Sequence, residues 1–222
     1  MIPVITIDGP SGAGKGTVAR LVAQQLGWHL LDSGALYRLT ALAGIDRGFD
    51  LNDEVAVAGC ARALAVEFKI VEDSVVIELD GSDVTTRVRS EEAGMGASTV
   101  AALPAVREAL FDRQRQFCQA PGLVADGRDM GTTIFPNALV KIFLTASAEA
   151  RAERRAKQLI QLGESVSLPR LLEDITARDE RDSARSASPL KPADDAILVD
   201  STALSIEQVV ACVVSELVAK QK

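Results

Sequence analysis

The sequence is poor in the residues on which many catalytic and metal sites depend. Only one of its 222 residues is histidine and three are cysteine, at the widely separated positions Cys60, Cys118 and Cys212. These numbers and spacings fit neither a disulfide framework nor a zinc site of Cys and His. With a single histidine, a nucleophilic Ser-His-Asp or Cys-His arrangement is also excluded. We expect His29 to be a strand residue whose ring is hydrogen-bonded.

Long apolar runs and an excess of positive charge are missing as well. The chain has 24 Lys and Arg against 31 Asp and Glu, which gives a net charge of −7. This balance argues against a general binder of nucleic-acid polymers or anionic membranes. No uncharged apolar stretch approaches the ~18 residues that a membrane span needs, and no secretory signal opens the chain. We therefore expect a cytoplasmic protein, and we expect it to be a monomer.

What remains is the composition of a globular protein, with 47% hydrophobic and 25% charged residues. Short apolar runs alternate with segments of helical periodicity, which predicts an α/β fold with a parallel central sheet flanked by helices. The expected strands span residues 2–7, 28–31, 123–125, 139–144 and 197–199. The expected helices lie after the first strand, at 33–47, 91–101, 104–117, 147–162 and 171–184, and after Ser205, which forms a capping box with Gln208.

Residues 66–89 show a different pattern. Val66–Val71, Val75–Leu79 and Val84–Val88 are predicted to be strands, and turn signals separate the first from the second and the second from the third. A small antiparallel meander is therefore expected as an insertion in a core of residues 1–65 and 90–222. We see no internal repeat, low-complexity tract or long linker.

A glycine-rich segment between the first strand and the first helix has the spacing of a phosphate-binding loop. It begins directly after Asp8, which with the next two residues forms a turn signal. In such a loop the backbone N–H groups and the helix N-terminus hold phosphates, and the lysine reaches the outer ones. Gly16 follows Lys15 here, so the hydroxyl that would face magnesium lies on Thr17, as in the nucleoside monophosphate kinases that this variant resembles. The loop is Gly9-Pro10-Ser11-Gly12-Ala13-Gly14-Lys15-Gly16-Thr17.

Polar residues follow two of the expected strands, where α/β proteins bind ligands. Ser33 and Arg38 follow the second strand. The alternative interpretations are that Ser33 is only a helix N-cap and that Arg38 is only a solvated charge on a helix. Asp126 ends a later strand, in the position of a carboxylate that holds magnesium directly or through water. Arg128 suits a phosphate, and an ionised Asp129 can accept from an exocyclic amine, although a surface turn is the alternative.

A third cluster of charges lies at the end of the expected helix 171–184. Arg178, Asp182 and Arg185 stand at i, i+4 and i+7, hence on one helical face. By composition alone, a solvated surface helix with salt bridges is the more common meaning of such a run.

Taken together, four motifs resemble the bacterial cytidylate kinases. They are the phosphate loop, Asp32-Ser33-Gly34-Ala35-Leu36-Tyr37-Arg38, Asp126-Gly127-Arg128-Asp129-Met130-Gly131-Thr132, and Arg178-Asp179-Glu180-Arg181-Asp182-Ser183 with Arg185 and Pro189-Leu190. They occur in the family's order, and the meander resembles the insertion that distinguishes this family from adenylate kinases. The resemblance implies a P-loop nucleoside monophosphate kinase fold with a short lid at about residues 156–170. It also implies transfer of the γ-phosphoryl group of ATP to CMP or dCMP with Mg²⁺.

The resemblance further implies a role for each matching residue. Ser98, Arg107 and Asp129 would read the cytosine ring, Arg38 and Arg128 would hold the α-phosphate, and Asp182 would bond the ribose. The whole implied CMP site is Ser33, Arg38, Ser98, Arg107, Arg128, Asp129, Arg178, Asp182 and Arg185. The implied catalytic cations are Lys15, Arg128, Arg178 and Arg185, the implied magnesium ligands are Thr17 and Asp126, and Arg154 and Arg155 of the basic helix would join the loop in binding ATP. We expect the cations to converge on one cleft in a surface that is acidic on average.

Two other functions stay open at this stage. A kinase for another small molecule, for instance a metabolite hydroxyl, could use the same scaffold. A nucleotide-binding switch is less favoured, because neither Asn52 nor Asn137 precedes a lysine and a guanine-reading Asn-Lys-x-Asp is therefore absent.

Overall fold

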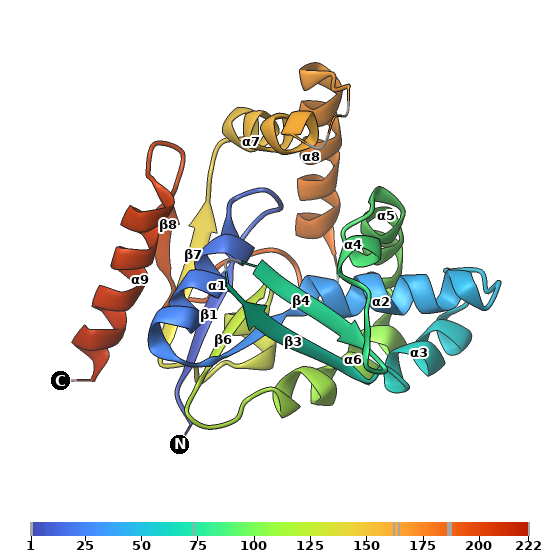
Figure 1. Ribbon diagram of the computed structural model, residues 1–222, viewed down its shortest axis with the longest axis horizontal. Helices are drawn as coiled ribbons and strands as arrows, with labels where there is room; N and C mark the ends of the chain where they lie inside the picture. Colours follow the sequence, from blue (N-terminus) through green and yellow to red (C-terminus); the bar gives the residue numbers. More distant parts are fainter. Residues whose placement is uncertain (1, 73, 162, 164, 186–187, 222) are drawn as a thin grey trace. The chain divides into compact units, whose positions relative to one another are not determined.

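The computed structural model describes residues 2–72, 74–161, 163, 165–185 and 188–221. The chain divides into two compact units. The first contains Met1–Val4 and Ala23–Asp126, and the second contains Ile5–Val22 and Gly127–Lys222. Each unit is described by itself below, with the elements labelled as in Figure 1.

The predicted parallel sheet is present. Its five strands have the order β2-β6-β1-β7-β8, and the pairs β2–β6, β1–β7 and β7–β8 are parallel. Every residue of β1 and β6 is buried, as expected for strands of a sheet that is covered on both faces. The strands are β1 (Val4–Asp8), β2 (His29–Asp32), β6 (Leu123–Gly127), β7 (Val140–Thr145) and β8 (Ile197–Asp200).

All five strands end later in the sequence than predicted, and two of these extensions include carboxylates of interest. β1 includes Asp8, and β6 includes Asp126, so both carboxylates are held by strand backbone instead of following it. The prediction for His29 is confirmed, since it lies on β2 with its ring Nε2 3.0 Å from the carbonyl oxygen of Ala120. The three cysteines are free thiols, as expected.

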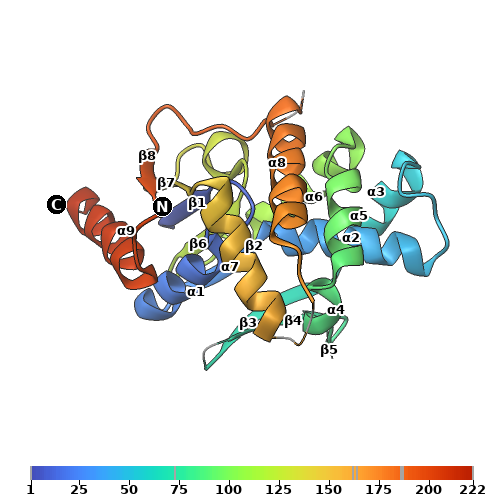
Figure 2. The same ribbon diagram turned by 90° about the horizontal axis from the view of Figure 1, so that it is seen from above.

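Four helices of the first unit pack against one another. α2 packs against α5 and α3, and α3 packs against α6, and Figure 2 shows α5 crossing α2. The crossing is close, because a Cβ on Gly96 of α5 would lie 2.8 Å from the Cβ of Ala41 on α2. The helices are α2 (Ser33–Asp46), α3 (Glu54–Arg62), α5 (Glu91–Val100) and α6 (Pro104–Gln116).

Helix α3 was not among the helices expected from the sequence, although Asp53 gives a usable signal. Its side chain accepts a hydrogen bond from the backbone N–H of Ala56 at 3.1 Å, the standard contact of an N-cap.

The meander also lies in the first unit, and its third strand was wrongly predicted. β3 (Val66–Val71) and β4 (Ser74–Leu79) form the expected hairpin, but β5 is only Ser82–Asp83, and Thr85–Val88 forms the single-turn helix α4. Two side-chain hydrogen bonds stabilise the turn between β5 and α4. The Asp83 carboxylate accepts from the Thr85 N–H, and the Thr85 hydroxyl accepts from the Ile77 N–H, both at 2.8 Å.

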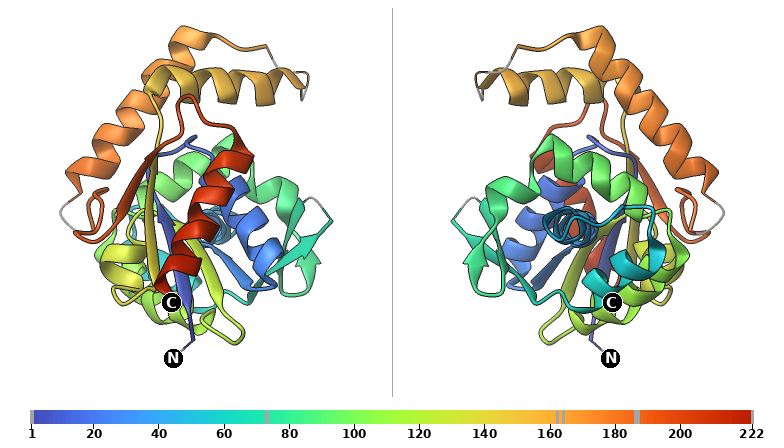
Figure 3. Two further views of the ribbon diagram at one scale, coloured as in Figure 1. Left: turned by 90° about the vertical axis from the view of Figure 1, so that its left-hand side faces the viewer. Right: turned by 90° about the vertical axis from the view of Figure 1, so that its right-hand side faces the viewer.

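In the second unit, α1 (Lys15–Leu26) follows the phosphate loop and continues into the first unit. α7 (Ala148–Gln161) and α8 (Leu168–Ala184) pack against each other, and α9 (Ile206–Lys220) packs against β7, as Figure 3 shows. The capping box of Ser205 and Gln208 at the start of α9 is confirmed.

The segment at about 156–170 that is predicted to be a lid includes the end of α7 and the start of α8. α8 begins three residues earlier than expected, with Pro169 in its first turn. Leu162 and Glu164, within the predicted lid, lie outside the described residues. Lid closure stays a prediction.

Candidate functional site

The phosphate loop lies between β1 and α1, as predicted. Gly9, Gly12 and Gly14 have φ angles of 146°, 78° and 93°, which L-residues with a side chain rarely adopt. At Gly9 a Cβ would lie 1.9 Å from the carbonyl oxygen of Leu144, so only glycine fits. The first turn of α1 contains no acidic residue, which keeps the positive end of its dipole available for an anion.

Lys15 is held within this loop. It is the first residue of α1, its residue surface is 6% exposed, and its Nζ donates to the carbonyl oxygen of Pro10 at 2.9 Å. Thr17, two residues further on, is exposed. The loop therefore presents the hydroxyl that the sequence assigns to magnesium and keeps the lysine against its own backbone.

Arg151 ties the phosphate loop to helix α8. It is only 4% exposed, its Nη1 donates to the carbonyl oxygen of Ser11 at 3.0 Å, and its Nε donates to that of Ala146 at 3.0 Å. The same guanidinium makes a bidentate pair with Asp179 on α8, with N–O distances of 3.1 and 2.5 Å. The sequence does not reveal this contact, because the partners of Arg151 are 140 and 28 residues away.

Arg128 and Arg185, both partly buried, form a charged group around the buried Asp182 in the second unit. Asp182 is 2% exposed, and it accepts from the Nε of Arg128 at 3.0 Å and from Arg185 through its other oxygen. Burial alone would raise the pKa of Asp182, but the charges of Arg128 and Arg185 outweigh it and hold this pKa below its usual value. Two arginines on one carboxylate leave a net positive charge, which suits a phosphate.

The prediction of one helical face is wrong for Arg185. α8 ends at Ala184, and Arg185 follows it with φ −59° and ψ 134°, which is not helical. Arg185 still reaches Asp182 from beyond the end of the helix. Arg178 lies on the helix, and its charge also lowers the pKa of Asp182.

Asp8, at the end of β1, is bonded to the segment that follows Asp129. Its Oδ1 accepts from the N–H of Met130 and its Oδ2 from the N–H of Gly131, both at 2.8 Å. The residue is 5% exposed. Burial raises the pKa of Asp8 to about 7, although the two N–H groups lower it. The sequence pattern marks Asp8 only as part of a turn signal; a carboxylate that ends a short, mostly apolar strand is the signal that could have found it.

The two arginines assigned to the ATP side differ in their surroundings. Arg154 on α7 donates to the backbone oxygen of Ser201 at 2.5 Å, whereas Arg155 is exposed. Ser201 is 3% exposed and donates to the carbonyl oxygen of Ala13 in the phosphate loop at 3.2 Å. Ser201 thus links Arg154 to the loop, a role that the sequence analysis did not assign.

Four residues of the expected CMP site lie in the first unit, on α2, α5 and α6. Ser33 is the first residue of α2 and is buried, while Asp32 is the N-cap, since its Oδ1 accepts from the Ala35 N–H at 3.0 Å. The alternative interpretation of Ser33 as the cap is therefore wrong. The four residues are Ser33, Arg38, Ser98 and Arg107.

Arg38, Ser98 and Arg107 are each held by their surroundings. Arg38 donates to the carbonyl oxygens of Val88 and Ser90 at 3.0 and 3.4 Å, so it is not a solvated helix charge. Ser98 donates to the carbonyl oxygen of Gly94 on α5 at 3.3 Å. The guanidinium of Arg107, on α6, lies 5.8 Å from the centroid of the Tyr37 ring on α2.

The donors predicted for magnesium are a hydroxyl and a carboxylate, the oxygen ligands that Mg²⁺ prefers. Asp126 is 9% exposed on β6, where it pairs in register with Asp32 of β2. Within the described ranges, no group of three or more His, Cys, Asp or Glu residues is placed to hold a metal ion. Mg²⁺ is commonly held by one or two carboxylates together with substrate phosphates, and Thr17 and Asp126 fit that use.

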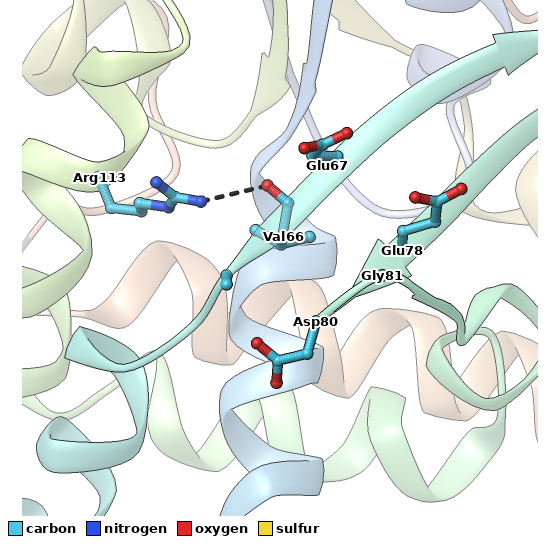
Figure 4. A pocket seen from close by; sticks show the side chains of 7 residues that line it. Val66, Glu67, Glu78, Asp80, Gly81 and Arg113 are labelled. Atoms are coloured by element: carbon cyan, nitrogen blue, oxygen red, sulfur yellow. Dashed lines mark hydrogen bonds between the residues drawn. The ribbon is translucent and has the colours of Figure 1, made fainter.

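A small pocket in the first unit lies on the meander (Figure 4). Glu67, Glu78 and Asp80 line it, together with Arg113, which donates to the carbonyl oxygen of Val66 at 3.2 Å. Its volume of about 160 Å³ is below the roughly 300 Å³ at which ligand pockets commonly begin. The pocket is also lined by three carboxylates and a single arginine, which is already hydrogen-bonded to the backbone. This excess of negative charge makes the pocket unsuitable for a nucleotide phosphate.

Comparison with known proteins gives consistent results. A model of the cytidylate kinase family matches residues 5–219. A cytidylate kinase of Photobacterium profundum is 61% identical over 94% of this chain and 92% of its own length. Another, of Pseudomonas paraeruginosa, is 60% identical over 96% of this chain and 94% of its own length.

Among solved structures, the crystal structure of a gluconokinase from Sinorhizobium meliloti 1021 matches with a TM-score of 0.48 and 16% sequence identity. The match covers 98% of this chain and 92% of that chain. None of the helices in the described part of the chain has the length and hydropathy to cross a membrane.

Proposed function

The chain belongs to the cytidylate kinase family, and on that premise we propose that it transfers the γ-phosphoryl group of ATP to CMP and dCMP. The products are ADP and CDP or dCDP. The γ-phosphoryl group is transferred to a phosphate oxygen of CMP or dCMP, so the enzyme is a phosphotransferase with a phosphate group as acceptor. Transfer of this kind needs little covalent chemistry from the protein; it needs an in-line approach, exclusion of water and stabilisation of charge on the transferred group.

The donor side of the proposed site is the loop from Gly9 to Thr17. The positive φ angles at its glycines, the N-terminus of α1 and the buried Lys15 support binding of the ATP phosphates. Lys15 would turn from the carbonyl oxygen of Pro10 to the outer phosphates and stabilise charge there during transfer. Arg154, held at Ser201 beside the loop, and Arg155 would complete the donor side.

The acceptor side of the proposed site would recognise the phosphate, the ribose and the base of CMP. Arg38 and Arg128 would hold the acceptor phosphate, and Asp182 would bond the ribose while it orients Arg128 and Arg185. Ser98, Arg107 and Asp129 would read the cytosine ring, with the Asp129 carboxylate accepting from the exocyclic amine. Ser33 would complete this side, and Arg178 and Arg185 would stabilise charge on the transferred phosphoryl group.

Mg²⁺ would be held by Thr17 and Asp126 together with the ATP phosphates. When bound, it supplies positive charge to the β- and γ-phosphate oxygens. We also propose that the protein is a cytoplasmic monomer, in which three free cysteines suit a reducing compartment.

The single observation that carries the proposal is the Arg128–Asp182–Arg185 group around the buried Asp182, which lies in the same unit as the phosphate loop. It concentrates positive charge in a chain of net charge −7. The deciding experiment is an assay of ADP release with CMP, dCMP, UMP, AMP and non-nucleotide acceptors. CMP and dCMP should give the highest kcat/KM, and a clear preference for AMP or for a metabolite hydroxyl would contradict the proposal.

A further inference from the structure

The N-terminus of the short π-helix after Asp129 has an unusual cap. This helix, η1, spans Met130–Ile134, and its N-cap residue is Asp129. The first N–H groups of a helix lack partners within the helix, and aspartate at the N-cap is among the best residues to accept from them. The Asp129 side chain nevertheless makes no capping hydrogen bond.

Asp8 supplies the cap instead, from 122 residues away in the sequence. Each of its carboxylate oxygens accepts from one N–H, those of Met130 and Gly131, at 2.8 Å. These are the two residues directly after Asp129, and Asp8 directly precedes Gly9. One side chain therefore fixes the backbone beside the proposed cytosine reader to the strand that enters the phosphate loop.

The contact is tight and depends on a glycine. A Cβ on Gly131 would lie 2.9 Å from Oγ1 of Thr6, 3.2 Å from Cδ of Lys141 and 3.3 Å from Oδ2 of Asp8. The neighbouring Thr6 is fully buried, and its hydroxyl has no hydrogen-bond partner among the described residues. The hydroxyl of Thr6 thus adds nothing to the cap, which makes this residue a suitable control.

We propose that Asp8 is a positioning residue for base recognition: by capping η1 in place of Asp129, it keeps the Asp129 carboxylate directed to the acceptor base. This inference rests on the proposed function, because it assigns the acceptor base to Asp129. Asp8 acts through Met130 and Gly131 and contacts no substrate. The charged groups that act on Asp8 are Asp129, which raises its pKa, and Lys15, which lowers it.

The test compares Asp8→Asn with the wild type and with Thr6→Val. An asparagine side chain can accept from only one of the two N–H groups and directs an NH₂ group at the other, so the Asp129 side chain should turn to cap its own helix. We expect the KM for CMP to rise about tenfold and the preference for CMP over UMP to fall by a similar factor, with the KM for ATP within about twofold of wild type. Thr6→Val should leave all three values near those of the wild type.

An equal rise in the KM values for ATP and CMP, or an unchanged preference for CMP over UMP, would overturn the proposal. If Asp8→Asn does not fold, Gly131→Ala disturbs the same contact from the other side. It should likewise raise the KM for CMP much more than the KM for ATP.

Amide hydrogen exchange provides a readout without substrate. In Asp8→Asn, the N–H groups of Met130 and Gly131 should exchange at least about tenfold faster than in the wild type. Unchanged exchange at both amides would also overturn the proposal. Absence of CMP turnover in the wild type would instead refute the proposed function, while the exchange rates would still test the cap.

Discussion

At the scale of single residues, two carboxylates in the second unit have opposite pKa shifts for physical reasons that are visible around them. Asp182 is buried between arginines, which hold its pKa below the usual value. Asp8 is buried with two N–H groups and no bonded cation, and its pKa is raised to about 7. Burial is common to both, so the bonded arginines decide the difference.

Asp8 predicts a pH dependence of stability. Because its pKa is higher in the folded state than in the unfolded state, it favours folding while it is protonated, and this contribution falls as the pH rises from about 4 to about 7. Relative to Asp8→Asn, the wild type should lose about 2–3 kcal/mol of unfolding free energy between pH 5 and pH 8. Urea unfolding of both proteins at the two pH values measures this difference, and a difference that does not change with pH would contradict it.

Asp182 predicts the reverse sign and an effect on the acceptor. Its lowered pKa stabilises the fold above the unfolded-state pKa, and this stabilisation is lost only as the pH falls below about 4. Asp182→Asn removes the charge that holds Arg128 and Arg185, so the KM for CMP should rise about tenfold or more at pH 7.5 while the KM for ATP changes little. Glu180→Gln, an exposed position on the same helix, is the control, and an unchanged KM for CMP in Asp182→Asn would exclude the assigned role.

At the scale of elements, α7 is joined to the phosphate loop by Arg151 and to α8 by the Arg151–Asp179 pair. The planar guanidinium serves three partners in different directions, which an ammonium group cannot do in the same geometry. The basic helix is therefore part of the loop's support in addition to being the start of the predicted lid.

Arg151→Lys should for this reason weaken the donor side. We expect a rise of about three- to tenfold in the KM for ATP with a smaller effect on the KM for CMP, because the lost bonds support the Ser11 peptide. Glu153→Gln, which alters an exposed side chain of the same helix without an assigned role, is the control. Steady-state kinetics with each substrate varied in turn measures both KM values. A larger rise in the KM for CMP than in the KM for ATP would refute the proposal that Arg151 supports the phosphate loop.

At the scale of the whole molecule, the proposed cations belong to both compact units. Lys15, Arg128, Arg178 and Arg185 lie in the second unit, and Arg38 and Arg107 lie in the first. Substrate binding should stabilise the folded chain, since a ligand that binds only the folded state adds RT ln(1 + [L]/Kd) to its stability.

CMP at 100 times its Kd should add about 2.7 kcal/mol to the unfolding free energy and raise the melting temperature. Lys15→Ala should keep this shift but lose most of the shift caused by ATP, and its turnover should fall by about 100-fold or more with every acceptor. Thermal melts with each nucleotide, together with the ADP-release assay, measure both effects. Loss of the CMP-induced shift in Lys15→Ala would contradict the division into donor and acceptor sides.

The sequence by itself determined the features that depend on neighbours within a few residues. The torsions of Gly9, Gly12 and Gly14, the capping box at Ser205 and the alternation of buried strands and helices follow from local chemistry. The four motifs sufficed to indicate the family because each one is a continuous stretch of the chain.

Only the tertiary structure decided which distant groups meet. Asp8 caps a helix 122 residues away, Arg128 pairs with Asp182 across 54 residues, and Arg151 reaches Ser11 across 140. The wrong third strand of the meander has the same origin, since the Thr85 hydroxyl bonds the backbone of a neighbouring strand, at Ile77, and ends the extended conformation. The physical reason is that local pattern sets torsions and caps, whereas the choice among possible partners depends on which strands and helices become neighbours when the core is buried.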